Sequence, residues 1–242
     1  ESAEPKAVHL NWHGSGYIIP GLGKDAPFCA YIASSTSTIV LDCDYRKAPE
    51  YPFPAPFHDA LDVIAYVQKH PEQFDLSSIT LGGFSAGGSL ALCASAALGP
   101  ELIRGVAAIY PNPDISSACR EPPSKEYDGG SDISPTIRQF FYNCAFVPSQ
   151  SLADKRISAV KNPAERFLKH VFVACGEGDS LYQNNVEFVY YLIKERHKGV
   201  EFMSIERESH GFDQMAKTEA SRERRDKLYE RVKKILDAIY AE

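Results

Sequence analysis

A serine framed by glycines follows an apolar run of the chain. Residues 83–87 read Gly-Phe-Ser-Ala-Gly, between the apolar run 79–83 and the small-residue run 86–98. This order predicts a strand, a sharp turn and a helix, and such a turn exposes the serine hydroxyl only when tiny residues flank it. The pattern therefore predicts that Ser85 is a nucleophile, with Gly83 and Gly87 required by the turn. The alternative is a glycine-rich loop that only packs a helix against a sheet.

A second small-residue segment directly follows the first apolar run. It reads His13-Gly14-Ser15-Gly16. A loop of this kind lets backbone N–H groups point at an oxyanion, and each such donor stabilises the transition state by roughly 3 kcal/mol in measured cases. Taken alone, an ordinary glycine turn explains the segment equally well. Together with the serine turn downstream, the segment predicts an oxyanion hole.

A serine nucleophile needs a base and an acid that orients the base. Among the seven histidines, His210 alone follows the last predicted strand in a polar loop, 206–213. When a strand-to-helix turn carries the serine, the chain order is serine, acid, histidine, so the base comes last. Two carboxylates after the preceding strand compete for the role of acid, Glu177 and Asp179. An alternative role for Asp179 is the N-cap of the helix that follows it.

The elements that must position these residues alternate between short apolar runs and longer periodic segments. That alternation indicates parallel strands joined by helices, buried on both faces. The strands are expected at Ala7–Trp12, Thr38–Cys43, Ile79–Gly83, Gly105–Tyr110, Val171–Cys175 and Val200–Ile205, and the helices near 25–35, 57–69, 86–98, 182–197 and 218–240. Asp59 and Asp62 are expected at a helix start, and Arg46 is expected to pair with Glu50.

One long stretch interrupts the alternation. Residues 112–165 are rich in Pro, Ser and Asp and contain an aromatic cluster after Ser134-Pro135, a helix-start signal. Connections of this length in a compact α/β unit are usually functional. We expect a small cap over the active site, inserted into a core made of residues 1–111 and 166–242. The alternative is a surface excursion that only covers a sheet edge.

Four motifs in order carry a resemblance to a known family. Residues 13–16 resemble the HGGG box of the hormone-sensitive-lipase-like family of α/β-hydrolases, and residues 44–50 with 53–55 resemble its YRLAPE…FPA segment. Residues 83–88 resemble its GDSAGG turn, and residues 209–212 contain its terminal HGF. The resemblance implies the α/β-hydrolase fold, with a mostly parallel central sheet flanked by helices and a small cap insertion. Only twelve residues precede His13, so upstream sequence is expected to be absent.

The resemblance also implies roles for particular residues. The oxyanion donors would be the backbone N–H groups of Ser15, Gly16 and Ala86, and Asp179 matches the family's acid position. Gly14 belongs to the same box. Two departures stand out: the middle glycine of the box is Ser15, and the residue before the nucleophile is Phe84 instead of Asp.

The implied activity is hydrolysis of a carboxylic ester through an acyl-enzyme, on small-molecule substrates. The aromatic cap favours short to medium acyl chains. No metal or organic cofactor is expected. Lactone or amide hydrolysis (arylformamide cleavage included) and acyl transfer stay open, because the same triad serves them. A non-catalytic ligand-binding relative is the alternative from a different class, and the presence of Ser85, Asp179 and His210 argues against it.

Composition excludes some partners and leaves others open. The net charge of −6 and the scattered Lys and Arg residues form no basic stripe, so nucleic acid is not an expected partner. No apolar run approaches the ~20 residues of a membrane span. The oligomeric state is open, a homodimer included. Single cysteines without metal-ligand spacing favour buried free thiols over disulfides and hence a cytoplasmic location; they are Cys29, Cys43, Cys93, Cys119, Cys144 and Cys175.

Overall fold

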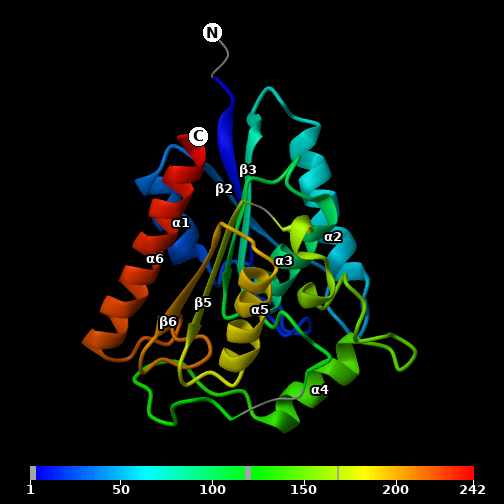
Figure 1. The fold of residues 1–242 in the computed structure, drawn as a ribbon, viewed down its shortest axis with the longest axis vertical. Helices are drawn as coiled ribbons and strands as arrows, with labels where there is room; N and C mark the ends of the chain where they lie inside the picture. Colours follow the sequence, from blue (N-terminus) through cyan, green and yellow to red (C-terminus); the bar gives the residue numbers. More distant parts are fainter. Residues whose placement is uncertain (1–3, 118–120, 168) are drawn as a thin grey trace.

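A parallel sheet forms the centre of the molecule (Figure 1). The computed structural model describes residues 4–117, 121–167 and 169–242. Within them, six strands lie in the order β2-β1-β3-β4-β5-β6, and every neighbouring pair is parallel. Their bounds are β1 Lys6–Trp12, β2 Ile39–Cys43, β3 Phe74–Phe84, β4 Gly105–Ile109, β5 His170–Gly176 and β6 Val200–Ile205.

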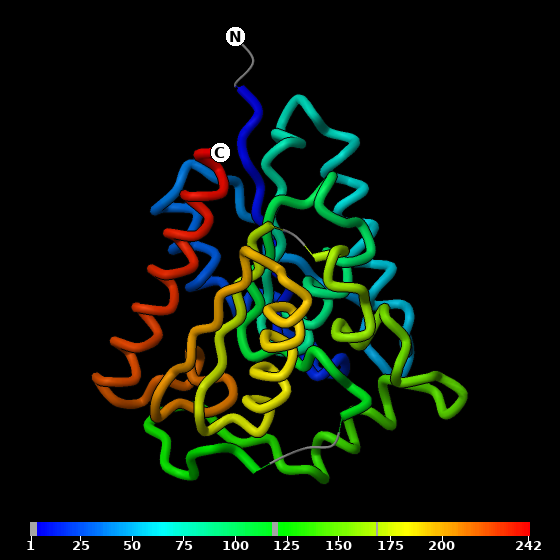
Figure 2. Tube along the Cα trace, in the orientation of Figure 1, coloured from blue at the N-terminus to red at the C-terminus, as the bar shows by residue number. Residues whose placement is uncertain are grey.

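Helices cover both faces of this sheet, as all-parallel sheets require. On one face α1 (Ala26–Ser35) packs beside α6 (Glu219–Tyr240). On the other face lie α2 (Ala55–Gln68), α3 (Ala86–Leu98) and α5 (Tyr182–Lys194). Figure 2 follows the chain from one layer to the next. The fold is therefore the α/β-hydrolase fold predicted above.

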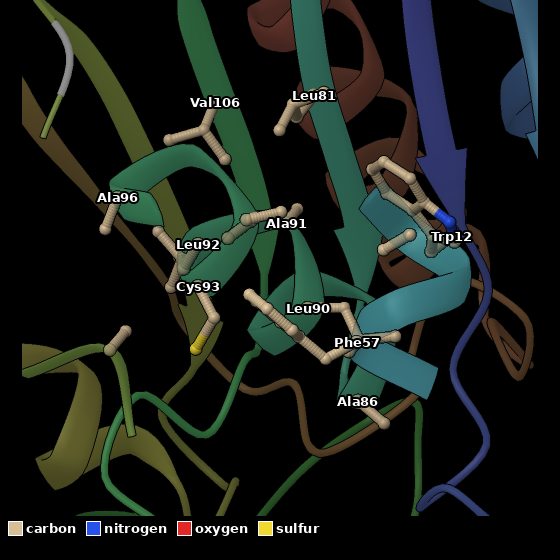
Figure 3. Close-up of a cluster of buried hydrophobic side chains, with 14 of the residues drawn as sticks. Trp12, Phe57, Leu81, Ala86, Leu90, Ala91, Leu92, Cys93, Ala96 and Val106 are labelled. Carbon is tan, nitrogen blue, oxygen red and sulfur yellow. The ribbon is translucent and has the colours of Figure 1, made fainter. Parts of the chain in front are cut away.

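The core is divided by the sheet into two clusters of buried side chains. The larger one contains α3, in which every residue from Ala86 to Ala96 is buried (Figure 3). Small residues let this helix approach the sheet closely, and its Leu90 and Leu92 pack with Phe57 of α2 and Val106 of β4 in the same cluster. A helix that is apolar on all sides must be buried. The serine turn at its start is thus anchored by a helix that is buried along most of its length.

The expected strands and helices are confirmed, with small shifts at their ends. The strand β3 begins at Phe74 instead of Ile79, because Phe74 pairs with Lys6 across an irregularity in the register. The helix α2 begins at Ala55, so no acidic residue lies in its first turn and the expectation for Asp59 and Asp62 was wrong. Asp59 instead binds Arg46, which does not pair with Glu50: Arg46 Nη2 lies 2.7 Å from Asp59 Oδ1.

Among its described residues, the segment 112–165 contains the helix α4 (Pro135–Ala145) and a short 3₁₀ turn at Ala159–Lys161, and a second 3₁₀ turn at Ala164–Arg166 crosses its end. Ser134 caps α4 by accepting a hydrogen bond from the N–H of Ile137. Figure 1 shows α4 beyond one end of the sheet, opposite the end from which the chain enters β1. The carboxyl ends of the parallel strands point toward α4.

Five of the six cysteines lie among the described residues, and all five are free thiols. Among the described residues Cys29, Cys43, Cys93 and Cys175 are buried free thiols and Cys144 is a half-buried one. Cys119 lies outside the described residues. In the part of the chain that the structure describes, we find no helix with the length and apolar character that crossing a membrane demands.

Candidate active site

Ser85 lies on a sharp turn between β3 and α3. Its backbone has φ 52° and ψ −118°, a conformation that L-residues rarely adopt. The flanking glycines show why the turn requires them: a Cβ built on Gly87 would lie 1.9 Å from the carbonyl oxygen of Trp12, and one on Gly83 would lie 2.5 Å from the same atom. The predicted glycine requirement at both positions follows from close backbone contact with the end of β1.

The side chains of Ser85, His210 and Asp179 form a hydrogen-bonded row. His210 Nε2 lies 2.9 Å from Ser85 Oγ, and His210 Nδ1 lies 2.7 Å from Asp179 Oδ2. Asp179 is fully buried, and its other oxygen accepts from the N–H of Leu181 at 2.8 Å. The carboxylate therefore orients His210 and caps the turn before α5 at the same time. Glu177, the competing carboxylate, instead accepts from Ser204 Oγ at 2.8 Å.

The loops that carry His210 and Asp179 are fastened to each other. The N–H of Gly178 donates to the carbonyl oxygen of Glu208 at 2.8 Å, and Ser209 Oγ donates to that of Gly178 at 2.8 Å. A Cβ on Gly176 would lie 2.2 Å from the Glu208 carbonyl oxygen, so the two loops touch through their backbones. This contact sets the spacing between His210 and Asp179.

A short segment of the insertion, residues 128–131, braces the His210 loop from outside. The N–H of Ser209 donates to the Gly129 carbonyl oxygen at 3.0 Å, and the N–H of Ser131 donates to that of His210 at 2.9 Å. Sequence reasoning missed this role. The local signal in the sequence was the pair Gly129-Gly130. The structure explains the second glycine, because a Cβ on Gly130 would lie 2.6 Å from the carbonyl oxygen of Ser209.

Tyr110, at the end of β4, lies against the histidine ring. The two ring centroids are 4.7 Å apart, and the Tyr110 hydroxyl donates to Asp213. Burial raises the pKa of the Asp213 carboxyl, a change that the hydrogen bond from Tyr110 partly offsets.

Behind the serine turn Phe84 is fully buried, with its ring 5.1 Å from that of Phe28. The departure at position 84 therefore places an aromatic ring in the core.

The loop 13–16 ends beside Ser85. A Cβ on Gly14 would lie 3.3 Å from Ser85 Cβ, so this loop passes directly over the serine turn. Gly16 has φ +56°, and a Cβ there would meet the Phe141 ring at 2.3 Å. Within the described residues, the N–H groups of Ser15, Gly16 and Ala86 donate to no protein acceptor, so all three remain available to a ligand.

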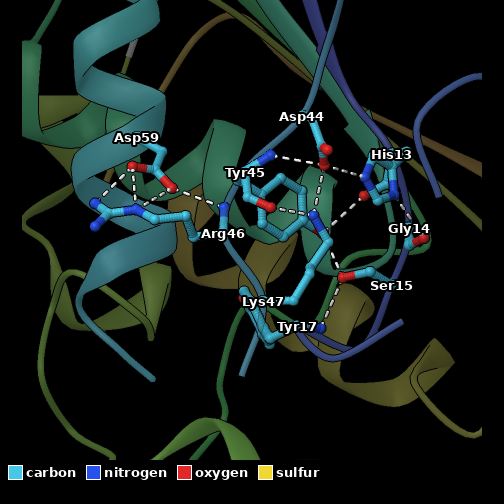
Figure 4. Close-up of polar contacts among 9 residues, drawn as sticks. All are labelled: His13, Gly14, Ser15, Tyr17, Asp44, Tyr45, Arg46, Lys47 and Asp59. Atoms are coloured by element: carbon cyan, nitrogen blue, oxygen red, sulfur yellow. Dashed lines mark hydrogen bonds and ion pairs between the residues drawn. The ribbon is translucent and has the colours of Figure 1, made fainter. Parts of the chain in front are cut away.

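Ser15 is held by Tyr45, a residue to which the sequence analysis gave no role (Figure 4). The Tyr45 hydroxyl donates to the His13 carbonyl oxygen at 2.8 Å and lies 2.6 Å from Ser15 Oγ. Because Tyr45 has one proton and gives it to a carbonyl, Ser15 must donate to Tyr45. Ser15 Oγ also accepts from the N–H of Tyr17 at 2.8 Å. The serine that replaces the family's glycine is thus fully hydrogen-bonded inside the loop.

The charged side chains of Asp44 and Lys47 lie beside the loop 13–16. His13 is buried, stacks on Tyr45 with ring centroids 5.0 Å apart, and its Nε2 lies 3.0 Å from Asp44 Oδ1. Partial burial alone would raise the pKa of the Asp44 carboxyl. Hydrogen bonds from Lys47 and His13 outweigh this effect and lower that pKa to about 2. The segment 44–47 therefore braces the loop and supplies no group to the reacting atoms.

Two cavities meet at Ser85. The narrow one has a volume of about 40 Å³ and is lined partly by the insertion, through Asn112, Ile115, Ile133, Arg138, Phe141 and Tyr142. The wider one, of about 250 Å³, is lined by His210, Gln214 and Met215 together with the loop 14–16. Among the described residues no cluster of three or more His, Cys, Asp or Glu side chains is placed to hold a metal ion.

Known proteins resemble the chain in sequence and structure. A family model described as the alpha/beta hydrolase fold matches residues 9–214. An ethyl acetate hydrolase of Pseudomonas putida is 29% identical over 195 residues, which cover 77% of this chain and 60% of that protein. A versiconal hemiacetal acetate esterase of Dothistroma septosporum is 33% identical over 115 residues, 44% of this chain and 35% of that protein.

Solved structures agree on the fold. A Pyrobaculum calidifontis esterase superposes with a TM-score of 0.81 at 22% identity, covering 97% of this chain and 78% of that one. The carboxylesterase EstE1, cloned from a metagenomic library, superposes with a TM-score of 0.82 at 20% identity. The superposition covers 98% of this chain and 82% of the EstE1 chain. The chain spans 60% of the length of the Pseudomonas relative and 35% of the length of the Dothistroma relative.

Proposed function

Since the chain belongs to the hormone-sensitive-lipase-like family of α/β-hydrolases, we propose that it hydrolyses carboxylic esters with Ser85 as nucleophile. The observation that carries the proposal is the row Ser85–His210–Asp179, with both hydrogen bonds below 3 Å and the serine on a strained turn. The esterase names of the relatives support the same reaction class.

In the proposed mechanism Ser85 Oγ attacks the ester carbonyl carbon while His210 Nε2 takes its proton. The N–H groups of Ser15, Gly16 and Ala86 bind the oxyanion. The C–O bond to the alcohol then breaks, and the alcohol leaves with the proton from His210. Water attacks the acyl-enzyme by the same route, which releases the acid and returns a proton to Ser85. Asp179 holds the histidine tautomer throughout and does not take the proton.

We also propose that residues 112–165 act as a cap on a core of residues 1–111 and 166–242. Asn112, Arg138 and Phe141 line the narrow cavity beside Ser85, which a mere surface excursion would not do. A cavity of about 40 Å³ favours short acyl chains, and medium ones require the side chains of the cap to move. The substrate is therefore a small-molecule ester of short to medium acyl length.

The test is hydrolysis of p-nitrophenyl esters from acetate to decanoate by the wild-type protein and by Ser85→Ala. We expect activity to decrease beyond about four to six acyl carbons, and the variant to lose at least roughly 10⁴-fold in kcat/KM. Ser37→Ala, an exposed serine, is the matched control and should keep wild-type rates. Wild-type-like rates in folded Ser85→Ala would rule out Ser85 as the nucleophile. Rates that increase toward decanoate would contradict the proposed preference for short to medium acyl chains.

A fluorophosphonate probe supplies a second readout that needs no suitable ester. The probe should add its mass to the peptide that contains Ser85, and the Ser85→Ala variant should remain unlabelled. An unlabelled wild-type protein would favour the non-catalytic ligand-binding alternative. Release of p-nitrophenol that speeds up with added alcohol, with transfer of the acyl group to that alcohol, would favour acyl transfer over hydrolysis.

A further inference from the structure

Tyr110 has a backbone conformation that is unusual for its residue type. It directly follows β4 with φ +37°, on the positive side that bulky L-residues rarely adopt. The residue is 1% exposed, and its N–H donates to the carbonyl oxygen of Ala174 at 2.6 Å. Strain of this kind persists only where the surrounding structure holds it, and it is concentrated at functional sites. Tyr110 lines the wider cavity beside Ser85, so the strain lies at the candidate active site.

The side chain of Tyr110 contacts two residues of the loop that carries the histidine. Its ring lies 4.7 Å from the His210 ring, centroid to centroid, with an angle of 57° between the two planes. Its hydroxyl donates to Asp213 Oδ1. An aromatic ring attracts a cation that lies within about 6 Å of its centroid. Tyr110 therefore connects His210, which gains a proton in the proposed reaction, to a second carboxylate.

Asp213 is a buried carboxylate that interacts with His210. Its side chain is shielded from water, because the residue is only 5% exposed. Burial raises the pKa of this carboxyl, whereas the hydrogen bond from Tyr110, backbone N–H groups and the nearby His210 ring act to lower it. Water and salt screen a buried charge much less than an exposed one. The Asp213 carboxylate therefore favours a proton on His210.

We propose that Tyr110 and Asp213 are positioning residues for His210, and that the Asp213 carboxylate, through the tyrosine bound to it, stabilises the protonated histidine formed in each step. The inference rests on the proposed function and deepens it. Asp179 binds Nδ1 of the imidazole, whereas Tyr110 lies against the ring. The two carboxylates thus support the same histidine from different positions, and both make it a stronger base toward Ser85.

Other elements also direct titratable groups toward this pair. Those that face Asp213 or His210 include Lys24, Asp25, Asp179 and Tyr229. Burial raises the pKa of Asp25 to about 7, so this carboxyl titrates in the range where a histidine does. Each pH profile is therefore measured in the wild-type chain and again in an Asp25→Asn background.

The first experiment follows kcat/KM for p-nitrophenyl acetate against pH in the wild type and in Asp213→Asn. A neutral His210 is required as base, so kcat/KM decreases as the pH falls and the ring takes up a proton. Without the Asp213 charge that uptake occurs at lower pH. We expect the midpoint of the acid limb to move down by about half to one pH unit, and kcat at pH 8 to fall roughly three- to tenfold with little change in KM.

The control for charge is Asp132→Asn. It removes the same charge from an exposed position next to Ser131, whose N–H donates to the His210 carbonyl oxygen. Its acid limb should stay within about 0.1 pH unit of the wild type, because water screens an exposed charge. A lower kcat in Asp213→Asn with an unmoved midpoint would give Asp213 a purely structural role and would overturn the inference.

Tyr110→Phe separates the hydroxyl from the ring. The variant keeps a ring against His210 and removes the donor to Asp213, so the buried carboxyl takes up a proton more readily. Its acid limb should move in the same direction as in Asp213→Asn, and the double variant should move no further than Asp213→Asn. Tyr182→Phe is the control: it loses a hydrogen bond to Ser204 Oγ, and its ring packs against Phe202. Shifts that add in the double variant would contradict the link between Tyr110 and Asp213.

An NMR titration of the His210 ring supplies a readout that does not depend on catalysis. Its Cε1–H signal should titrate at lower pH in folded Asp213→Asn than in the wild type, by the same half to one pH unit expected above. An unmoved titration in a protein that hydrolyses p-nitrophenyl acetate defeats this inference alone. Failure of the wild type to hydrolyse any ester defeats the proposed function, while the titration still decides whether Asp213 acts on His210.

Discussion

The two walls of the site are built in different ways. On one side the serine turn is fixed by backbone atoms: Gly83 and Gly87 touch the carbonyl of Trp12 at distances that admit no side chain. On the other side α4 contributes side chains, and only its Arg138 and Ala145 are buried while Ile137 and Phe140 are about half exposed. The backbone contacts at Gly83 and Gly87 leave no room for a larger residue. The side chains of α4 can be substituted one at a time.

This difference assigns separate tasks to the two walls. The sheet side holds the groups that the proposed chemistry requires, because their spacing must stay constant during the reaction. In the proposed function, the insertion supplies the groups that would meet the variable part of a substrate. Substitutions on the sheet side should therefore slow the reaction of every ester, whereas those on α4 should change which ester reacts.

The largest effect is expected for Asp179→Asn. The amide can still accept from the N–H of Leu181, so the fold should persist, but it can no longer stabilise a protonated His210. We expect kcat on p-nitrophenyl acetate to fall by roughly 10⁴-fold, as for the equivalent change in other serine hydrolases. Glu177→Gln, which changes the competing carboxylate, is the control and should stay within about threefold of the wild type. A large loss of kcat in Glu177→Gln would indicate that Glu177, and not Asp179, is the acid that orients His210.

Gly87→Ala tests the rigidity of the sheet side. A methyl group 1.9 Å from the Trp12 carbonyl oxygen forces α3 away from β1. We expect either no folded protein or a loss of kcat of roughly 10²-fold or more, since displacement by about 1 Å has that effect on a reacting group. Gly23→Ala, where a Cβ meets no atom within 4 Å, should cost only about 1 kcal/mol for its positive φ. Similar behaviour of the two variants would show that the turn is less tightly packed than described.

Much of the sheet side could be predicted from the sequence, because its causes are local. Apolar runs specify the strands, and the glycine spacing around Ser85 reflects a steric requirement of the turn itself. The order of strands then brings the loops of Asp179 and His210 to the same sheet end as Ser85. The catalytic roles of these residues stay predictions.

The insertion side and the bracing contacts could not be predicted in this way. Tyr45 meets Ser15 across thirty positions of the chain, and Arg138 meets Ser180 across 42. Such pairs leave no period or spacing in the sequence. The pairing of Arg46 with Glu50 was expected from their closeness in the sequence, and it was wrong because the true partner, Asp59, lies thirteen positions further along the chain on α2.

Tyr45→Phe tests how firmly the oxyanion loop must be held. The variant leaves the His13 carbonyl oxygen and the Ser15 hydroxyl without this partner in a buried site, which costs about 1–3 kcal/mol of stability. We expect kcat to fall by roughly tenfold with little change in KM. In a double-mutant cycle, Ser15→Gly and Tyr45→Phe should be coupled by more than about 0.5 kcal/mol. Tyr51→Phe, an exposed tyrosine, is the control, and additivity of the pair would disprove the link.

A smaller effect is expected from Asp25, which joins β1 to the loop after His210. Its carboxylate accepts from Asn11 at 3.0 Å and from Gln214 at 2.9 Å, and burial raises its pKa from 3.8 to about 7. The folded state therefore binds more protons than the unfolded state between pH 4 and 7, so this group lowers the stability as pH rises through that window. Asp25→Asn should gain stability relative to the wild type from pH 5 to pH 8, measured by urea unfolding. Asp62→Asn, at an exposed position, should show no such trend.

Phe141→Ala should have the smallest effect on rate and the clearest effect on selectivity. The Phe141 ring covers Gly16 and lines both cavities, so its removal joins them into one larger space. We expect kcat/KM for p-nitrophenyl acetate to decrease a few-fold and the preferred acyl length to increase by about two to four carbons. Phe140→Ala is the matched control, because that ring is 58% exposed on the same helix and lines neither cavity. If both variants kept the wild-type profile, α4 would not select the acyl group and the contrast between the two walls would fail. A shift in Phe141→Ala alone would show that one side chain of α4 sets the length limit while the serine turn continues to work.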